Sequence, residues 1–150
     1  MSDDNGLARF IAKAKRNTFA SGRKPKVLED GYREFVFEEG EYRYKDRFSG
    51  SDQFTGTETV SEDGTRIWVM EYSGLMLDTV TDKERFNEFL KGALRLVGEN
   101  RPFRGPENYH RWGMVYTNES EGDLRSFNGT ERILFKGEEI YRLEYYGGKR

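Results

Sequence analysis

The sequence predicts an α+β fold in which one unit, a helix followed by a meander of antiparallel strands, is used twice. Three observations predict this fold. One segment of the chain is repeated, apolar and polar residues alternate in several short runs, and two stretches have the spacing of an amphipathic helix. The 150 residues suffice for a single domain with a sizeable core. We expect repeat units at roughly 5–77 and 81–148, related by a pseudo-twofold axis, with two main helices packed on antiparallel sheet.

The repeat is the clearest feature of the sequence. Residues 54–74 return as residues 127–147 at a constant offset of 73 (127 − 54), without a gap. Nine of the 21 positions are identical, whereas roughly one identity would arise by chance. This level of identity indicates an internal duplication.

Two helices are expected, near residues 7–16 and 82–97. The first has an apolar stripe that consists of Leu7, Phe10, Ile11 and Ala14. Three residues could cap it: Asp3, Asp4 and Asn5. The second helix opens with a capping box at residues 81–84. Its stripe consists of Phe86, Phe89, Leu90, Ala93, Leu94 and Val97.

Period-two alternation predicts the strands. Residues 33–37 and 42–48 alternate around Glu39 and Gly40, which indicates a hairpin. The remaining strands are expected at 54–61, 65–73, 113–119, 127–135 and 138–146. The second unit has no full counterpart of the first strand. The order of elements leaves two arrangements open, because the units can share one sheet or form two facing sheets.

Composition excludes several classes of function. The formal net charge of −2 provides no general attraction to nucleic acid or anionic membranes, although a basic stretch runs from Arg9 to Lys26. We interpret that stretch as a solvated face, with a phosphate or nucleic-acid contact as the alternative. The chain has no cysteine, no apolar run of membrane-spanning length and no signal peptide at its first residues. We therefore expect a cytoplasmic protein that binds no membrane, with nucleic-acid binding unlikely.

Four short stretches carry a family resemblance: 54–58, 68–74, 102–106 and 141–148. In these stretches the chain resembles an uncharacterised prokaryotic family, a domain of unknown function that occurs alone or fused behind helix-turn-helix transcriptional regulators. The resemblance spans nearly the whole chain and implies no particular activity. This chain has no room for a helix-turn-helix of its own.

Strand alternation places carboxylates on the aromatic face of the sheet. Glu58 shares a face with Phe54 and Val60, and the repeat places Glu131 in the same way. A buried carboxylate must be paired, hydrogen-bonded or exposed to a wet cavity. These acids could therefore stabilise the fold through tyrosine or arginine partners, or they could line a ligand pocket. The candidate ligand-binding residues are Tyr44, Asp46, Glu58, Trp68, Tyr72, Arg104, Tyr116, Glu131, Tyr141 and Tyr145.

The sequence assigns no catalytic residue, no metal site and no cofactor. A single histidine, His110, without cysteine is poor support for a metal site, which usually needs three or four ligands. His110 could also be a general base, but no serine or cysteine nucleophile signature accompanies it. Arg101 and Arg104 flank a Pro-Phe pair and could either clamp an anion or brace their own loop.

The function expected from these features is a non-enzymatic ligand-binding or sensing domain with an aromatic, carboxylate-bearing pocket. Its partner would be a small-molecule ligand. One alternative is a small enzyme that uses Glu58 or Glu131 for acid–base chemistry while Tyr72 or Tyr145 polarises the substrate. The other alternative is a protein-interaction domain that forms a homodimer through sheet edges.

Overall fold

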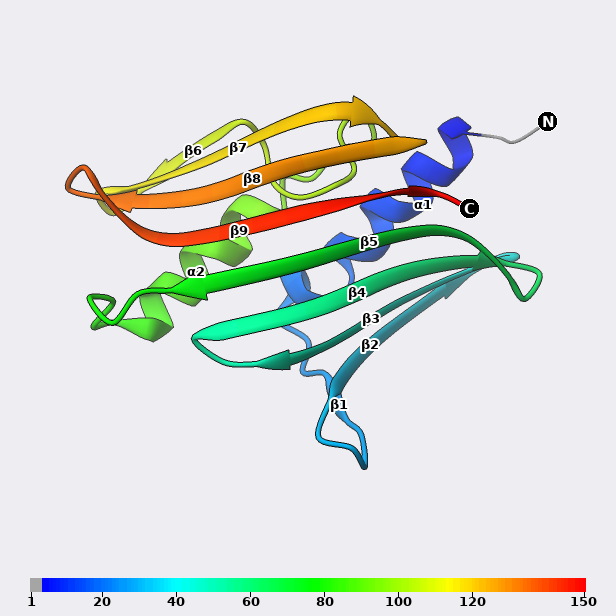
Figure 1. Ribbon diagram of the computed structural model, residues 1–150, viewed down its shortest axis with the longest axis horizontal. Coiled ribbons are helices and arrows are strands. Elements are labelled where there is room, and N and C mark those ends of the chain that lie inside the picture. Colours follow the sequence, from blue (N-terminus) through cyan, green and yellow to red (C-terminus); the bar gives the residue numbers. More distant parts are fainter. Residues whose placement is uncertain (1–3) are drawn as a thin grey trace.

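The computed structural model describes residues 4–150, and Asp3, one of the expected helix caps, lies outside them. It contains two α-helices, one 3₁₀-helix and nine β-strands (Figure 1). The helices are α1 (Asp4–Arg16), η1 (Phe19–Ser21) and α2 (Lys83–Leu94). The strands of the N-terminal half are β1 (Lys26–Val27), β2 (Arg33–Glu39), β3 (Tyr42–Gly50), β4 (Gln53–Glu62) and β5 (Thr65–Met76). Those of the C-terminal half are β6 (Asn108–Arg111), β7 (Met114–Asp123), β8 (Ser126–Phe135) and β9 (Glu138–Lys149).

All nine strands form one antiparallel sheet in the order β1-β2-β3-β4-β5-β9-β8-β7-β6. Of the two arrangements that the sequence left open, the shared sheet is therefore the one observed. The two halves meet where β5 pairs with β9, and Tyr72 lies opposite Tyr145 in this pair. Each half forms its own meander on either side of that central pair (Figure 1).

Both helices cover the same face of the sheet and lie behind it in Figure 1. The ring of Phe10 in α1 stacks on Tyr42 of β3, with 5.0 Å between the ring centroids. The ring of Phe86 in α2 lies 5.4 Å from that of Tyr141 in β9. These contacts confirm that the apolar stripes of both helices face an aromatic core. No helix in residues 4–150 is long and apolar enough to cross a membrane.

The observed elements agree with the predicted α+β class and differ in detail. The edge strands β1 and β6 were not predicted, because strands of two and four residues are too short to show alternation. Strand β5 extends to Met76 because its last residues pair with β9. Helix α2 ends at Leu94. Beyond it the backbone hydrogen bonds span three residues instead of four, as where the amide of Val97 donates to the carbonyl of Leu94. Val97 is nevertheless buried, as its place in the stripe predicted.

Two glycines within strands are covered by tyrosine rings. Tyr72 covers Gly56 and Tyr145 covers Gly129 from the neighbouring strand. A Cβ atom built on either glycine would lie 2.2 Å from the covering tyrosine hydroxyl oxygen. Any side chain here would push the tyrosine ring away, so glycine is required by close packing.

Candidate functional site

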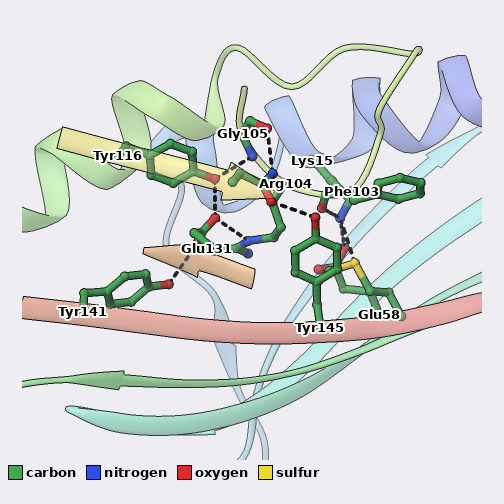
Figure 2. Close-up of polar contacts among 11 residues, drawn as sticks. Lys15, Glu58, Phe103, Arg104, Gly105, Tyr116, Glu131, Tyr141 and Tyr145 are labelled. Atoms are coloured by element: carbon green, nitrogen blue, oxygen red, sulfur yellow. Dashed lines mark hydrogen bonds and ion pairs between the residues drawn. The ribbon is translucent and has the colours of Figure 1, made fainter. Parts of the chain in front are cut away.

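Glu131 is the centre of a polar network in the C-terminal half (Figure 2). Its side chain is fully buried on the aromatic face of β8. The guanidinium of Arg104 binds both carboxylate oxygens, with Nε 3.0 Å from Oε2 and Nη2 2.8 Å from Oε1. The hydroxyl of Tyr141 donates to Oε1 at 2.7 Å, and that of Tyr116 donates to Oε2. The carboxylate is thus saturated by charge-assisted bonds.

The loop before β6 is fixed to this network through its backbone. The amide of Gly105 donates to the hydroxyl of Tyr116 at 2.9 Å. The side-chain amide of Asn118 donates to the carbonyl of Gly105 at 2.9 Å, while its oxygen accepts from the Tyr145 hydroxyl at 2.8 Å. Arg101 also donates to the backbone carbonyl of Asn118 at 2.9 Å. The Arg101–Arg104 loop therefore clamps a carboxylate of its own chain and is braced at the same time.

The pKa values in this network follow from the ion pair. Burial alone raises the pKa of Glu131, but the charge and hydrogen bonds of Arg104 outweigh burial and hold it below the ordinary value. Burial lowers the pKa of Arg104, and the Glu131 charge more than reverses this, so the guanidinium pKa is well above its usual value. Both groups are charged at neutral pH, and the two charges compensate each other.

Glu58 is the centre of a second network, in the N-terminal half. Its side chain is 3% exposed, and the Nζ atom of Lys15 lies 3.0 Å from its Oε1. The Tyr44 hydroxyl donates to the same oxygen. Lys15 also donates to the carbonyl oxygen of Phe103 (Figure 2). Because Phe103 precedes Arg104, this bond connects the two networks.

The second network contains an additional acid, Asp46. It lies directly opposite Glu58 in the pairing of β3 with β4, and the Tyr72 hydroxyl donates to its Oδ1 at 2.7 Å. Burial, followed by the charge of Glu58, raises the pKa of Asp46 to about 8. Burial likewise lowers the pKa of Lys15 against the opposing effect of Glu58. Two acids here share the electrostatic field of Lys15, with Arg104 nearby.

A small cavity adjoins this group of charges. Its volume is about 30 Å³, and four charged side chains reach it: Lys15, Asp46, Glu58 and Arg104. That volume accommodates one or two water molecules. The arrangement provides a buried titratable group next to a space large enough for water, but no room for an organic ligand.

The structure brings nine of the ten predicted site residues into these two networks. The exception is Trp68, whose ring stacks on Phe127 at 5.7 Å and whose Nε1 has no hydrogen-bond partner within residues 4–150. Sequence reasoning missed Lys15. The available signal was its position four residues after Ile11, beside the apolar stripe of the first helix.

A much larger hollow lies on the opposite, helix-free face of the sheet. This groove has a volume of about 450 Å³. Its lining residues are Tyr32, Arg47, Thr55, Gly56, Thr57, Glu71, Tyr72, Ser73, Glu144 and Tyr146. The floor of the groove is low because the residues of β4 and β5 that form it are threonine, glycine and serine, which are small. Of the ten predicted site residues, only Tyr72 lines it.

Aromatic and charged side chains form the walls of the groove. Tyr146 is 59% exposed, and its hydroxyl donates to the carboxylate of Glu71. On the other side, the guanidinium of Arg47 lies 3.8 Å above the ring of Tyr32 and pairs with Asp30. Glu71 and Glu144 alternate with the inward Tyr72 and Tyr145 and so lie on this outer face, and no sequence pattern indicates a hollow between them.

Neither a metal centre nor a histidine site emerges in residues 4–150. No group of three or more histidine, aspartate or glutamate side chains there could hold a metal ion. His110 is exposed on the edge strand β6. It stands apart from both networks and from the groove.

Comparison with known proteins identifies the family. The family model described as domain of unknown function DUF5680 matches residues 46–149, which is more than half of the chain. The chain therefore belongs to the DUF5680 family. Neither the curated proteins nor the solved structures contain a match to it.

Proposed function

We propose that this DUF5680 domain is a non-enzymatic ligand-binding or sensing domain whose ligand occupies the groove on the open face of the sheet. The groove carries the proposal. Its 450 Å³ falls within the range of about 300–1,000 Å³ typical of small-molecule sites. It combines exposed aromatic surface with hydroxyl and carboxylate groups, which fits recognition of a polar organic compound.

The sequence predicted an aromatic, carboxylate-bearing pocket on the covered face of the sheet, whereas the proposed site is the groove on the open face. On the covered face, Glu131 already has Arg104, Tyr116 and Tyr141 as partners. The cavity beside Glu58 has room for only one or two waters. A substrate site at either acid, which the enzyme alternative requires, would need the core to open. This argues for a structural role of the buried carboxylates.

Tyr72 gives the domain a route from binding to sensing. Tyr72 contributes to the floor of the groove, while its hydroxyl donates a hydrogen bond to Asp46 on the other face of the sheet. A ligand that shifts β5 would alter that bond and the proton affinity of Asp46. The resemblance to domains fused behind helix-turn-helix regulators in prokaryotes fits such a role by association.

We also propose that the two halves are copies of one duplicated unit, roughly residues 5–77 and 81–148. The central β5–β9 pair supports this, because Tyr72 lies opposite Tyr145, its own equivalent in the sequence repeat. The β4–β5 register shifts after Val60, and the β8–β9 register shifts after Ile133, the equivalent position. An experimental structure in which 54–74 and 127–147 failed to superpose would contradict the duplication.

Location and partners belong to the same proposal. A cytoplasmic location is consistent with a chain that lacks cysteine. Several basic residues of the 9–26 stretch are engaged within the chain, since Lys13 pairs with Glu39 and Arg16 donates to the carbonyl of Val97 at 2.8 Å. This favours a domain that does not bind nucleic acid. A homodimer through the sheet edges remains the alternative, to be tested by mass in solution.

Thermal-shift screening of a metabolite library, followed by calorimetric titration of each hit, tests the ligand-binding proposal. Thr57→Trp fills the floor of the groove and should abolish binding. Thr117→Trp is the matched control, because Thr117 is an outward-facing threonine of β7 and lies outside the groove, two strands away from β9. Hits that bind both variants as well as the original chain would place the ligand elsewhere and refute the proposal.

A further inference from the structure

A second hollow continues the groove along the same face of the sheet. Its volume is about 220 Å³. Its lining residues are Gln53, Ser73, Gly74, Leu75, Leu77, Glu139, Tyr141, Arg142 and Glu144. Ser73 and Glu144 line both hollows, so the two spaces adjoin. Together they form an elongated depression across the β5–β9 pair at the centre of the sheet.

One end of this depression exposes leucine side chains beside the charged Glu139 and Arg142. Glu71, Ser73 and Leu75 alternate with inward residues on β5 and therefore share the open face. Two residues of strand advance about 6.6 Å, which places Glu71 about 13 Å from Leu75 along the strand. Near Glu71 the surface is acidic and aromatic, whereas Leu75 and Leu77 are 44% and 39% exposed at the other end. Exposed leucines that line a hollow indicate contact with an apolar group.

Among residues 4–150, the polar end of the depression holds one acid without an ion pair, Glu71. Arg47 is engaged by Asp30 and by the ring of Tyr32. Glu139 pairs with Arg132 (Nε–Oε1 3.2 Å) and with Arg142 (Nη1–Oε1 3.7 Å), and Arg142 also pairs with Glu144 (Nε–Oε1 3.4 Å), so two cations match these two acids. Within residues 4–150, no lysine or arginine forms an ion pair with Glu71, whose recorded partner is the neutral hydroxyl of Tyr146. A carboxylate beside an exposed tyrosine ring is suited to a cation, which gains from both.

We propose that the two hollows form one site for an amphiphilic organic cation. Its amine or guanidine head lies between Glu71, Glu144 and the Tyr146 ring, and its apolar chain covers Leu75 and Leu77. This assignment rests on the proposed ligand-binding function of the groove and specifies the chemical class of the ligand. An anion would meet Glu71 and Glu144, and a small cation would leave the leucines uncovered.

Four simple probes separate charge from chain length in a calorimetric or NMR titration: n-octylamine, n-octanoate, n-octanol and n-butylamine. We expect n-octylamine to bind about tenfold more tightly than each of the others, a difference of about 1.4 kcal/mol. In Glu71→Gln, n-octylamine should no longer bind more tightly than n-octanol. In Leu75→Ser, it should no longer bind more tightly than n-butylamine. Glu119→Gln and Leu96→Ser, exposed residues outside both hollows, are the matched controls and should leave all four affinities unchanged.

The outcomes distinguish this inference from the proposed function. Binding of n-octanoate as tightly as n-octylamine, or an unaltered preference in Glu71→Gln, would overturn the cation assignment. If a neutral or anionic library hit then lost binding in Thr57→Trp, the groove would still be a ligand site. If Thr57→Trp affected no ligand at all, both proposals would fall.

Discussion

The two buried networks use the same types of side chain in different electrostatic states. Glu131 is paired with the guanidinium of Arg104, and the residue opposite it on β7 is the neutral Asn118. Glu58 is paired with the ammonium of Lys15, and the residue opposite it on β3 is the acid Asp46. One network therefore has one acid for one cation, whereas the other has two acids for one lysine.

This difference separates stability from responsiveness. A guanidinium that binds both carboxylate oxygens fixes geometry as well as charge, which a lysine does not. The Glu131 network is thus expected to be rigid and insensitive to pH near neutrality. The Glu58 network keeps a titratable acid beside a small cavity, and Tyr72 connects that acid to the floor of the groove. Of the two networks, the N-terminal one suits the proposed sensing role.

Removal of the cations should produce the largest difference between the networks. Arg104→Met leaves the fully buried Glu131 without a counter-ion, and we expect a loss of about 3–5 kcal/mol in the free energy of unfolding. Lys15→Met should cost about 2 kcal/mol, because Asp46 can remain protonated and Arg104 remains nearby. Urea denaturation of both variants at neutral pH measures the two values. Equal losses would show that the cations are equivalent and that the comparison is wrong.

Neutralisation of the central acids should give a smaller difference in the same direction. Glu131→Gln leaves Arg104 in the core beside a neutral amide and should cost about 3 kcal/mol. Glu58→Gln should cost about 1 kcal/mol, since Asp46 can then ionise and become the counter-ion of Lys15.

The pH dependence provides the internal check on this pair of variants. The folded-state pKa of Glu131 is lowered, so its contribution is present above the unfolded pKa and is lost as pH falls through the folded value. The cost of Glu131→Gln should therefore shrink in acid. A cost that stayed constant down to the acid transition would disprove the proposed ion-pair origin.

The sequence predicted most of the fold because local patterns carry it. The repeat, the helix stripes and the alternating runs gave the α+β class and seven of the nine strands. Short edge strands such as β6 (Asn108–Arg111) were missed, since they exist only through pairing with a longer neighbour. Whether the halves share a sheet depends on the β5–β9 pairing, a long-range contact that no local pattern encodes.

The candidate site was predictable only as a set of residues on a face. Period-two counting correctly placed Glu58 and Glu131 inside, but it could not show that Lys15 and Arg104 reach them from outside the sheet. Nor could it reveal the groove, which arises from small residues on β4 and β5 between larger ones on neighbouring strands. Such a hollow depends on the residues that surround Thr57 and Ser73 in space, and many of these residues are distant from them in the sequence.

Exchange of the two residues opposite the acids should convert each network toward the other. Asn118→Asp places an acid opposite Glu131 and removes the amide donor to Gly105, and we expect a loss of about 2 kcal/mol. Asp46→Asn imitates Asn118, because its amide oxygen can still accept from Tyr72. We expect a gain on the order of 1 kcal/mol at pH 8.

The sign of the pH effect of Asp46→Asn follows from the raised pKa. The folded-state pKa of Asp46 is about 8 and thus above its unfolded value, so its contribution is complete below the unfolded pKa. That contribution is lost as pH rises toward 8. The original chain should lose stability over this window relative to Asp46→Asn. Parallel stability curves for the two proteins between pH 5 and pH 9 would contradict the buried-acid assignment.

The smallest expected effect concerns the two tyrosine hydroxyls that face these residues. Tyr145→Phe removes a neutral bond to Asn118 and should cost about 1 kcal/mol at every pH. Tyr72→Phe removes a bond to Asp46, whose strength depends on the charge of that carboxyl. Below pH 8 Asp46 is mostly protonated, and the cost should again be about 1 kcal/mol. Above pH 8 the lost bond is charge-assisted, so the cost should rise to about 2 kcal/mol, whereas the cost of Tyr145→Phe should stay constant.

Both substitutions keep the rings that cover Gly56 and Gly129, so denaturation of each at pH 6 and pH 9 isolates the hydroxyl. A pH-independent cost for Tyr72→Phe would mean that the titratable acid of the N-terminal network does not respond to the tyrosine, and the proposed route from groove to core would fail.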